Sequence, residues 1–251
     1  MNKNSLLISL YELTETYFWH FNDPIVLNIF FAGCKLWGNL KDDQSLPYKF
    51  VRMIFQCTGG GILVPIFINV IPVSLGNDAY PIAIGISFLL HMYLPVLRDV
   101  VKQSPAVKAA LVIMFETQRA SVVTKLTTAA AAAIPATEFA FPLFGPIFCG
   151  GVAGCGGAFL PMDKGLAPIE KGLAANMSTA LFAATCYHLF VSTSVSEGVE
   201  DASQKAQVVM ASFFIAYSLA TEVGFSTIVK SGRSEVATES SKKKTKKAKK
   251  A

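Results

Sequence analysis

Apolar residues gather in seven long stretches that short polar connections separate. The stretches cover about residues 18–37, 50–74, 79–97, 104–134, 139–161, 173–194 and 206–229. Because a helix needs roughly 20 apolar residues to cross the hydrocarbon core of a bilayer, each stretch is long enough for one span. The pattern predicts an all-α transmembrane domain over residues 18–229. A short N-terminal segment, 1–17, precedes this domain, and a polar tail, 230–251, follows it.

Composition supports a membrane protein. The chain is 52% hydrophobic and 16% charged, with a mean hydropathy of +0.46, whereas soluble domains carry about 25% charged residues. Residues 231–251 hold eight Lys/Arg and two Glu, so the remainder of the chain carries a net charge of −1. The basic character therefore belongs to the tail, which we expect to be disordered, and no nucleic-acid partner is predicted.

Charges in the connections predict the orientation. Connections on the same side as the tail hold Lys41, Lys49, Arg98, Lys102, Lys164 and Lys171, and the opposite connections are mainly acidic. Because basic loops stay in the cytosol, we expect a cytosolic C-terminus, a luminal N-terminus and an odd number of spans. Lys247 and Lys249 match a dilysine retrieval signal of the endoplasmic reticulum. A solvated polybasic tail that touches anionic lipid is the alternative.

Glycines interrupt two of the stretches. The second contains Gly59, Gly60 and Gly61, and the fifth contains Gly154, Gly156 and Gly157. Their separation by three spans predicts an inverted repeat, with units at about 18–97 and 104–194 and a seventh helix at about 206–229. Paired glycine-interrupted segments indicate a permeation path near the membrane midplane, because unwound backbone must face water or protein. Close helix packing through glycine is the alternative.

Charged residues also lie inside the fourth stretch, at Glu116, Arg119 and Lys125. Intramembrane charges are rare and point to function. Glu116 and Arg119 are three residues apart and can form an ion pair, which could be purely structural. Alternatively, Arg119 faces a pore or an anionic lipid headgroup.

No enzyme, metal site or bound cofactor is predicted. The sequence has no phosphate-binding loop, GxSxG or HExxH motif, and its five cysteines and three histidines show no metal or triad spacing.

Four segments together resemble the trimeric intracellular cation (TRIC) channel family, of the animal type. They are CTGGGIL (57–63), FETQR (115–119), GCGG (154–157) and KKKTKK (242–247). The resemblance implies two inverted three-helix units plus a seventh helix, a homotrimer, and one pore per protomer between kinked second and fifth helices. It also implies a potassium current across the endoplasmic or sarcoplasmic reticulum, which balances charge during calcium release.

The resemblance extends to a lipid. Eukaryotic members bind phosphatidylinositol 4,5-bisphosphate at Lys-Glu-Val-x-Arg on the fourth helix. Glu116 and Arg119 match this motif, whereas Phe115 stands in place of its lysine and Ala153 in place of an arginine of some animal members. Arg119, helped by Gln118 or Lys125, would then hold the phosphate.

A secondary transporter with inverted repeats is the alternative function. Around both glycine clusters the chain offers only backbone and small side chains. Such groups favour ions over organic solutes, so the channel is preferred.

Overall fold

The computed structural model describes residues 25–160 and 165–224. Over these residues every regular element is a helix, which confirms the all-α class. The segment 1–17 and the tail with Lys247 and Lys249 lie outside the described residues.

Each of the seven apolar stretches overlaps with one longer helix. These are α2 (Ile25–Trp37), α3 (Leu46–Phe67), α5 (Ala79–Tyr93), α7 (Pro105–Ala133), α8 (Phe144–Ala153), α9 (Ala175–Ser192) and α10 (Ala202–Leu219). A π-helical turn, Ala220–Gly224, continues α10.

The prediction of seven helices is wrong in number, because the described residues form nine α-helices. The two additional helices are α4 (Val73–Gly76) and α6 (Pro95–Gln103). α5 ends at Tyr93 because the next residue, Leu94, precedes Pro95, and a residue before proline is disfavoured in the α region; Leu94 has φ −125° and ψ 62°. The chain then turns by 87° into α6, whose charged residues lie in a segment expected to be a loop.

Few of these helices could cross a membrane unaided. Of those in the described part, α3 alone is long and apolar enough, and the bent α5–α6 pair also qualifies if it is one broken span. α2 and α8 are apolar but short, with 13 and 10 residues. α7 has 29 residues but carries several charges. Several of the seven expected spans are therefore longer than the helices that they contain.

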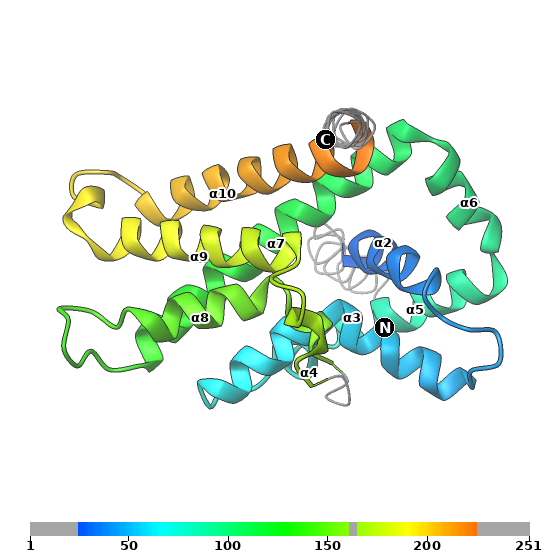
Figure 1. Ribbon diagram of the computed structural model, residues 1–251, viewed down its shortest axis with the longest axis horizontal. Coiled ribbons are helices and arrows are strands. Elements are labelled where there is room, and N and C mark those ends of the chain that lie inside the picture. Colours follow the sequence, from blue (N-terminus) through cyan, green and yellow to red (C-terminus); the bar gives the residue numbers. More distant parts are fainter. Residues whose placement is uncertain (1–24, 161–164, 225–251) are drawn as a thin grey trace, which may run out of the picture.

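α7 is the central element of the fold. It packs against α2, α8, α9 and α10, while α2 packs on α5 and α3 on α8 (Figure 1). Its side chains enter three core clusters, through Val112 beside Phe31, Ala130 beside Val64, and Ala120 beside the fully buried Phe214. The division into two three-helix units plus a seventh helix, and their inverted symmetry, stay predictions.

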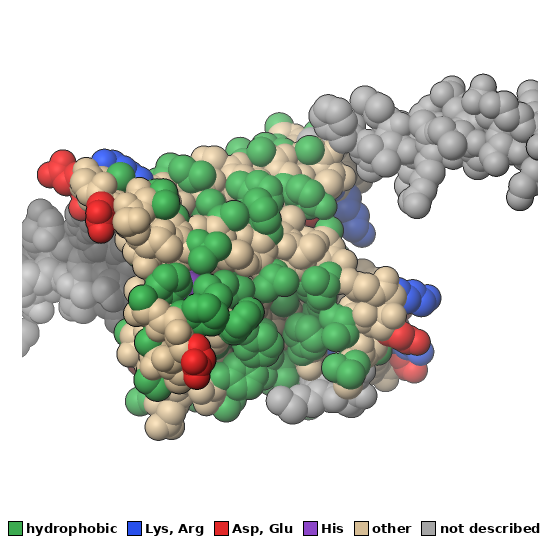
Figure 2. Space-filling view, turned by 60° about the vertical axis from the view of Figure 1, so that its left-hand side comes forward, with side chains coloured by type: hydrophobic (Ala, Val, Ile, Leu, Met, Phe, Trp, Pro, Cys, Tyr) green, Lys and Arg blue, Asp and Glu red, His purple; other side chains and the backbone are tan. Residues whose placement is uncertain are grey.

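The outer surface is strongly apolar. Figure 2 shows hydrophobic side chains over much of one face. Ile71, Leu75, Tyr93 and Phe144 are each more than 70% exposed. A soluble monomer rarely exposes large contiguous apolar patches, so this surface suits lipid or another protein chain.

Candidate functional site

A cavity of about 480 Å³ lies where α2, α3, α7 and α10 meet the end of α8. All six glycines that the sequence singled out line it: Gly59, Gly60, Gly61, Gly154, Gly156 and Gly157. Glu116, Gln118 and Arg119 line it as well. Lys125 does not, because it is exposed elsewhere on α7. The structure thus joins all but one of the candidate pore and lipid residues in a single site.

Most of these glycines are contact points between helices. A Cβ added to Gly60 would lie 2.1 Å from the Ala153 carbonyl oxygen, and one added to Gly156 would lie 2.4 Å from the Gly60 nitrogen. A Cβ added to Gly59 would lie 2.5 Å from the Gly157 Cα, and one added to Gly157 would lie 2.9 Å from the Gln56 carbonyl oxygen. Without side chains, α3 and the segment after α8 can touch backbone to backbone.

The two glycine clusters differ in backbone structure. α3 continues as one α-helix through Gly59–Gly61, so the expected interruption of the second helix is absent. The fifth helix does break: α8 ends at Ala153, and a 3₁₀ turn, Gly156–Ala158, follows. Gly61 has open space around its Cβ position, with no atom beyond its chain neighbours and the adjacent backbone of its own helix within 4 Å, and it borders the cavity.

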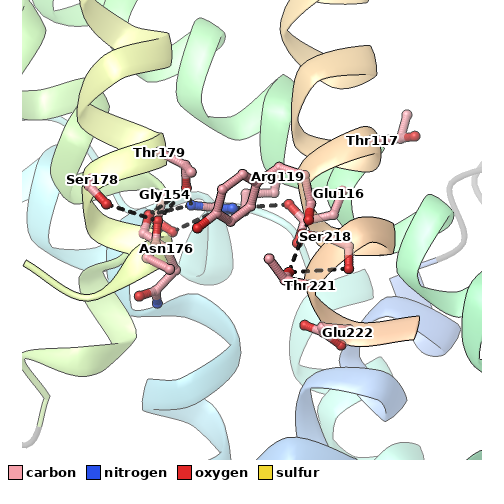
Figure 3. Close-up of polar contacts among 12 residues, drawn as sticks. Glu116, Thr117, Arg119, Gly154, Asn176, Ser178, Thr179, Ser218, Thr221 and Glu222 are labelled. Carbon is pink, nitrogen blue, oxygen red and sulfur yellow. Dashed lines mark hydrogen bonds and ion pairs between the residues drawn. The ribbon is translucent and has the colours of Figure 1, made fainter. Parts of the chain in front are cut away.

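Arg119 joins three elements across the cavity wall (Figure 3). Its Nη1 donates to Glu116 Oε2 at 3.0 Å, and its Nε donates to the Gly154 carbonyl at 3.1 Å. Its Nη2 donates to Thr179 Oγ1 at 3.1 Å and to the Asn176 carbonyl. The guanidinium also lies over the ring of Phe214, 4.4 Å from its centroid. The side chain is therefore held by the protein itself.

Glu116 is equally well bonded. Its second oxygen, Oε1, accepts a hydrogen bond from Ser218 Oγ of α10 at 2.8 Å. The side chains of Glu116 and Arg119 are only 4% and 9% exposed. Removing one partner of such a buried pair costs about 3–5 kcal/mol, because a charge is left uncompensated. The contacts fit the structural ion pair that the sequence left open, and a lipid phosphate at Arg119 would have to replace several of them.

Sequence reasoning did not assign two charged residues to the site. Lys35 of α2 and Glu222 of the π-helical turn line the cavity, with Lys35 Nζ 2.7 Å from Glu222 Oε1. Both are charged residues within apolar stretches, and this position was the sequence signal that could have indicated a role in the site. Their pairing joins positions 187 residues apart, so no local spacing could predict it.

Comparison with known proteins adds a structural relative. No protein-family model matches the chain, and no curated protein matches its sequence. A solved structure matches the fold of this chain: a trimeric intracellular cation channel from C. elegans in the absence of Ca²⁺, with a TM-score of 0.62 and 18% sequence identity. The match covers 78% of this chain and 88% of the channel chain. The chain has the TRIC channel fold. The resemblance that the glycine clusters and charged fourth helix indicated is thus confirmed at the level of the fold.

Proposed function

We propose that the protein is a channel for monovalent cations, chiefly potassium. The observation that carries the proposal is the coincidence of the TRIC fold with a cavity bordered by both glycine clusters. The cavity wall offers carbonyl, hydroxyl and amide oxygens, including those of Asn28, Thr58 and Thr179. Such oxygens replace part of the water shell of a cation without fixed charge.

The conduction path would lie within one protomer, between α3 and the end of α8. Gly61 is the glycine most suited to line it, because its Cβ position is open. The apolar outer surface would face lipid and the other subunits of a homotrimer. The membrane would be that of the endoplasmic or sarcoplasmic reticulum, with the current balancing charge during calcium release.

Phosphoinositide is the proposed modulator. Arg119 lines the cavity beside Gln118, but its guanidinium is bonded to Glu116, Gly154, Asn176 and Thr179. Lipid binding there would therefore exchange internal contacts for phosphate contacts and loosen the wall between α7 and α9. Lys125 is exposed on α7 and lies outside the cavity lining, so it would contact a lipid headgroup only at a position separate from Arg119.

A secondary transporter is the second candidate. A volume of about 480 Å³ lies within the range of small-molecule sites, about 300–1,000 Å³. The feature that separates the two functions is the kind of flux: a channel gives discrete unitary currents, whereas a transporter gives slow, saturating flux.

The test is single-channel recording of purified protein in planar bilayers under a potassium gradient. We expect unitary currents that reverse near the potassium potential. Gly61→Val should reduce the conductance, because its side chain enters the cavity. Gly85→Val is the matched control, since Gly85 of α5 also has open space but does not line the cavity. Saturating flux without unitary current would overturn the channel in favour of the transporter.

A further inference from the structure

The charged residues that line the cavity in the described part of the chain form two ion pairs of different character. Arg119 and Glu116 are buried, with side chains 9% and 4% exposed. Lys35 and Glu222 also line the cavity, but their side chains are 37% and 29% exposed. The second pair is therefore the one that an ion from outside can reach.

The two carboxylates also differ in what holds them. Glu116 uses both oxygens, one with Arg119 and one with Ser218. The carboxylate of Glu222 meets the ammonium of Lys35 through Oε1. Exposed pairs of this kind contribute little stability and are screened by salt, so a dissolved cation can compete with Lys35.

Two aromatic rings complete the surroundings of the Lys35 ammonium. Its Nζ lies 4.7 Å from the centroid of Phe31 and 5.1 Å from that of Phe115. The negative face of an aromatic ring attracts a cation. A carboxylate and two ring faces thus surround one positive charge at the edge of the cavity.

The backbone fixes the position of Glu222 independently of Lys35. Glu222 lies in the π-helical turn Ala220–Gly224, a rare geometry that often marks functional sites. Lys108 of α7 donates from Nζ to the Glu222 carbonyl at 2.8 Å. This contact would hold the turn beside the cavity even if Lys35 moved away.

We propose that Glu222, with the rings of Phe31 and Phe115, forms a site for a monovalent cation at the edge of the cavity. The Lys35 ammonium fills this site in the structure and acts as a tethered competitor of the entering ion. The inference rests on the proposed channel function. It assigns ion entry to the end of α10, and Lys35 sets how strongly the entrance attracts cations.

The test compares unitary conductance in about 20 mM and about 500 mM KCl, because low salt leaves charges unscreened. Lys35→Met should raise conductance at low salt by at least about twofold, since Glu222 is then free to attract cations. Glu222→Gln should lower it by a similar factor. Both effects should shrink at high salt. In the double variant the gain from Lys35→Met should disappear, and Lys35→Arg should stay close to wild type.

Matched controls are Lys41→Met and Glu170→Gln, both exposed and outside the cavity lining, which should leave the low-salt conductance unchanged. If Lys35→Met fails to assemble, Glu222→Gln decides the test alone. If the wild type conducts and Glu222→Gln has the same low-salt conductance, the cation site is overturned, whereas the proposed channel function still holds. A wild type without unitary current would overturn the channel function itself.

Discussion

Neighbouring glycines of α3 should respond to the same substitution in opposite ways. In Gly60→Ala the new Cβ would lie 2.1 Å from the Ala153 oxygen and 2.7 Å from its carbonyl carbon. These are backbone atoms that no rotamer change can move, so α3 and α8 must separate. In Gly61→Ala the new Cβ meets no atom within 4 Å.

The magnitudes follow from two opposing terms. Alanine gains about 1 kcal/mol over glycine inside a helix, at either position. Overpacking costs about 1–3 kcal/mol, and the backbone contact places Gly60 at the upper end. We therefore expect Gly60→Ala to destabilise the fold by about 2 kcal/mol and Gly61→Ala to stabilise it by up to about 1 kcal/mol. For a chain of this size the difference corresponds to roughly 6–12 °C in Tm.

The assay is thermal unfolding of the purified protein in one detergent, followed by intrinsic fluorescence. Gly85→Ala is the control, because Gly85 lies inside α5 with similar open space. It should behave like Gly61→Ala. Equal loss of stability in Gly60→Ala and Gly61→Ala would refute the reasoning, since it would mean that α3 needs flexible glycine at both positions. A neutral Gly60→Ala would refute the close contact with α8.

Three further substitutions test the polar contacts of the bundle by the same thermal unfolding. Arg119→Met should destabilise the fold by about 3–5 kcal/mol by leaving Glu116 uncompensated, and a second change, Glu116→Gln, should recover part of that loss; absence of recovery would contradict a coupled pair. Tyr187→Phe should cost about 1 kcal/mol, because the hydroxyl lies 2.9 Å from Thr128 Oγ1 and 2.7 Å from Ser203 Oγ, and an unchanged Tm would count against this network.

Helix positions could be predicted closely where local chemistry marks the start of a helix. The fourth stretch, 104–134, agrees with α7, Pro105–Ala133. Ser104 accepts a hydrogen bond from the Val107 nitrogen, and proline occupies the first helical position, where it loses no helical bond. α6 was missed because its charges resemble a loop, although Pro95 also suits a helix start.

The role of the glycines could not be settled from the sequence. Glycine permits both a helix break and a close helix contact, and both need the same missing side chain. The partner decides between them. Gly60 faces the backbone of Ala153 and remains helical, whereas Gly154 caps the end of α8. Such a distinction depends on contacts across the bundle, which periodicity within one helix cannot supply.

The break at the end of α8 and the buried Glu116–Arg119 pair stabilise each other. Where α8 ends, the Gly154 carbonyl loses its helical partner, and an unsatisfied carbonyl in an apolar surrounding costs free energy. Arg119 supplies the donor at 3.1 Å, and Glu116 compensates the charge that Arg119 introduces. Ser218 then bonds the remaining carboxylate oxygen and ties α10 to α7. Glu116 and Arg119 therefore have protein partners without any ligand: they stabilise the break in the fifth helix, and the cavity lies at that break.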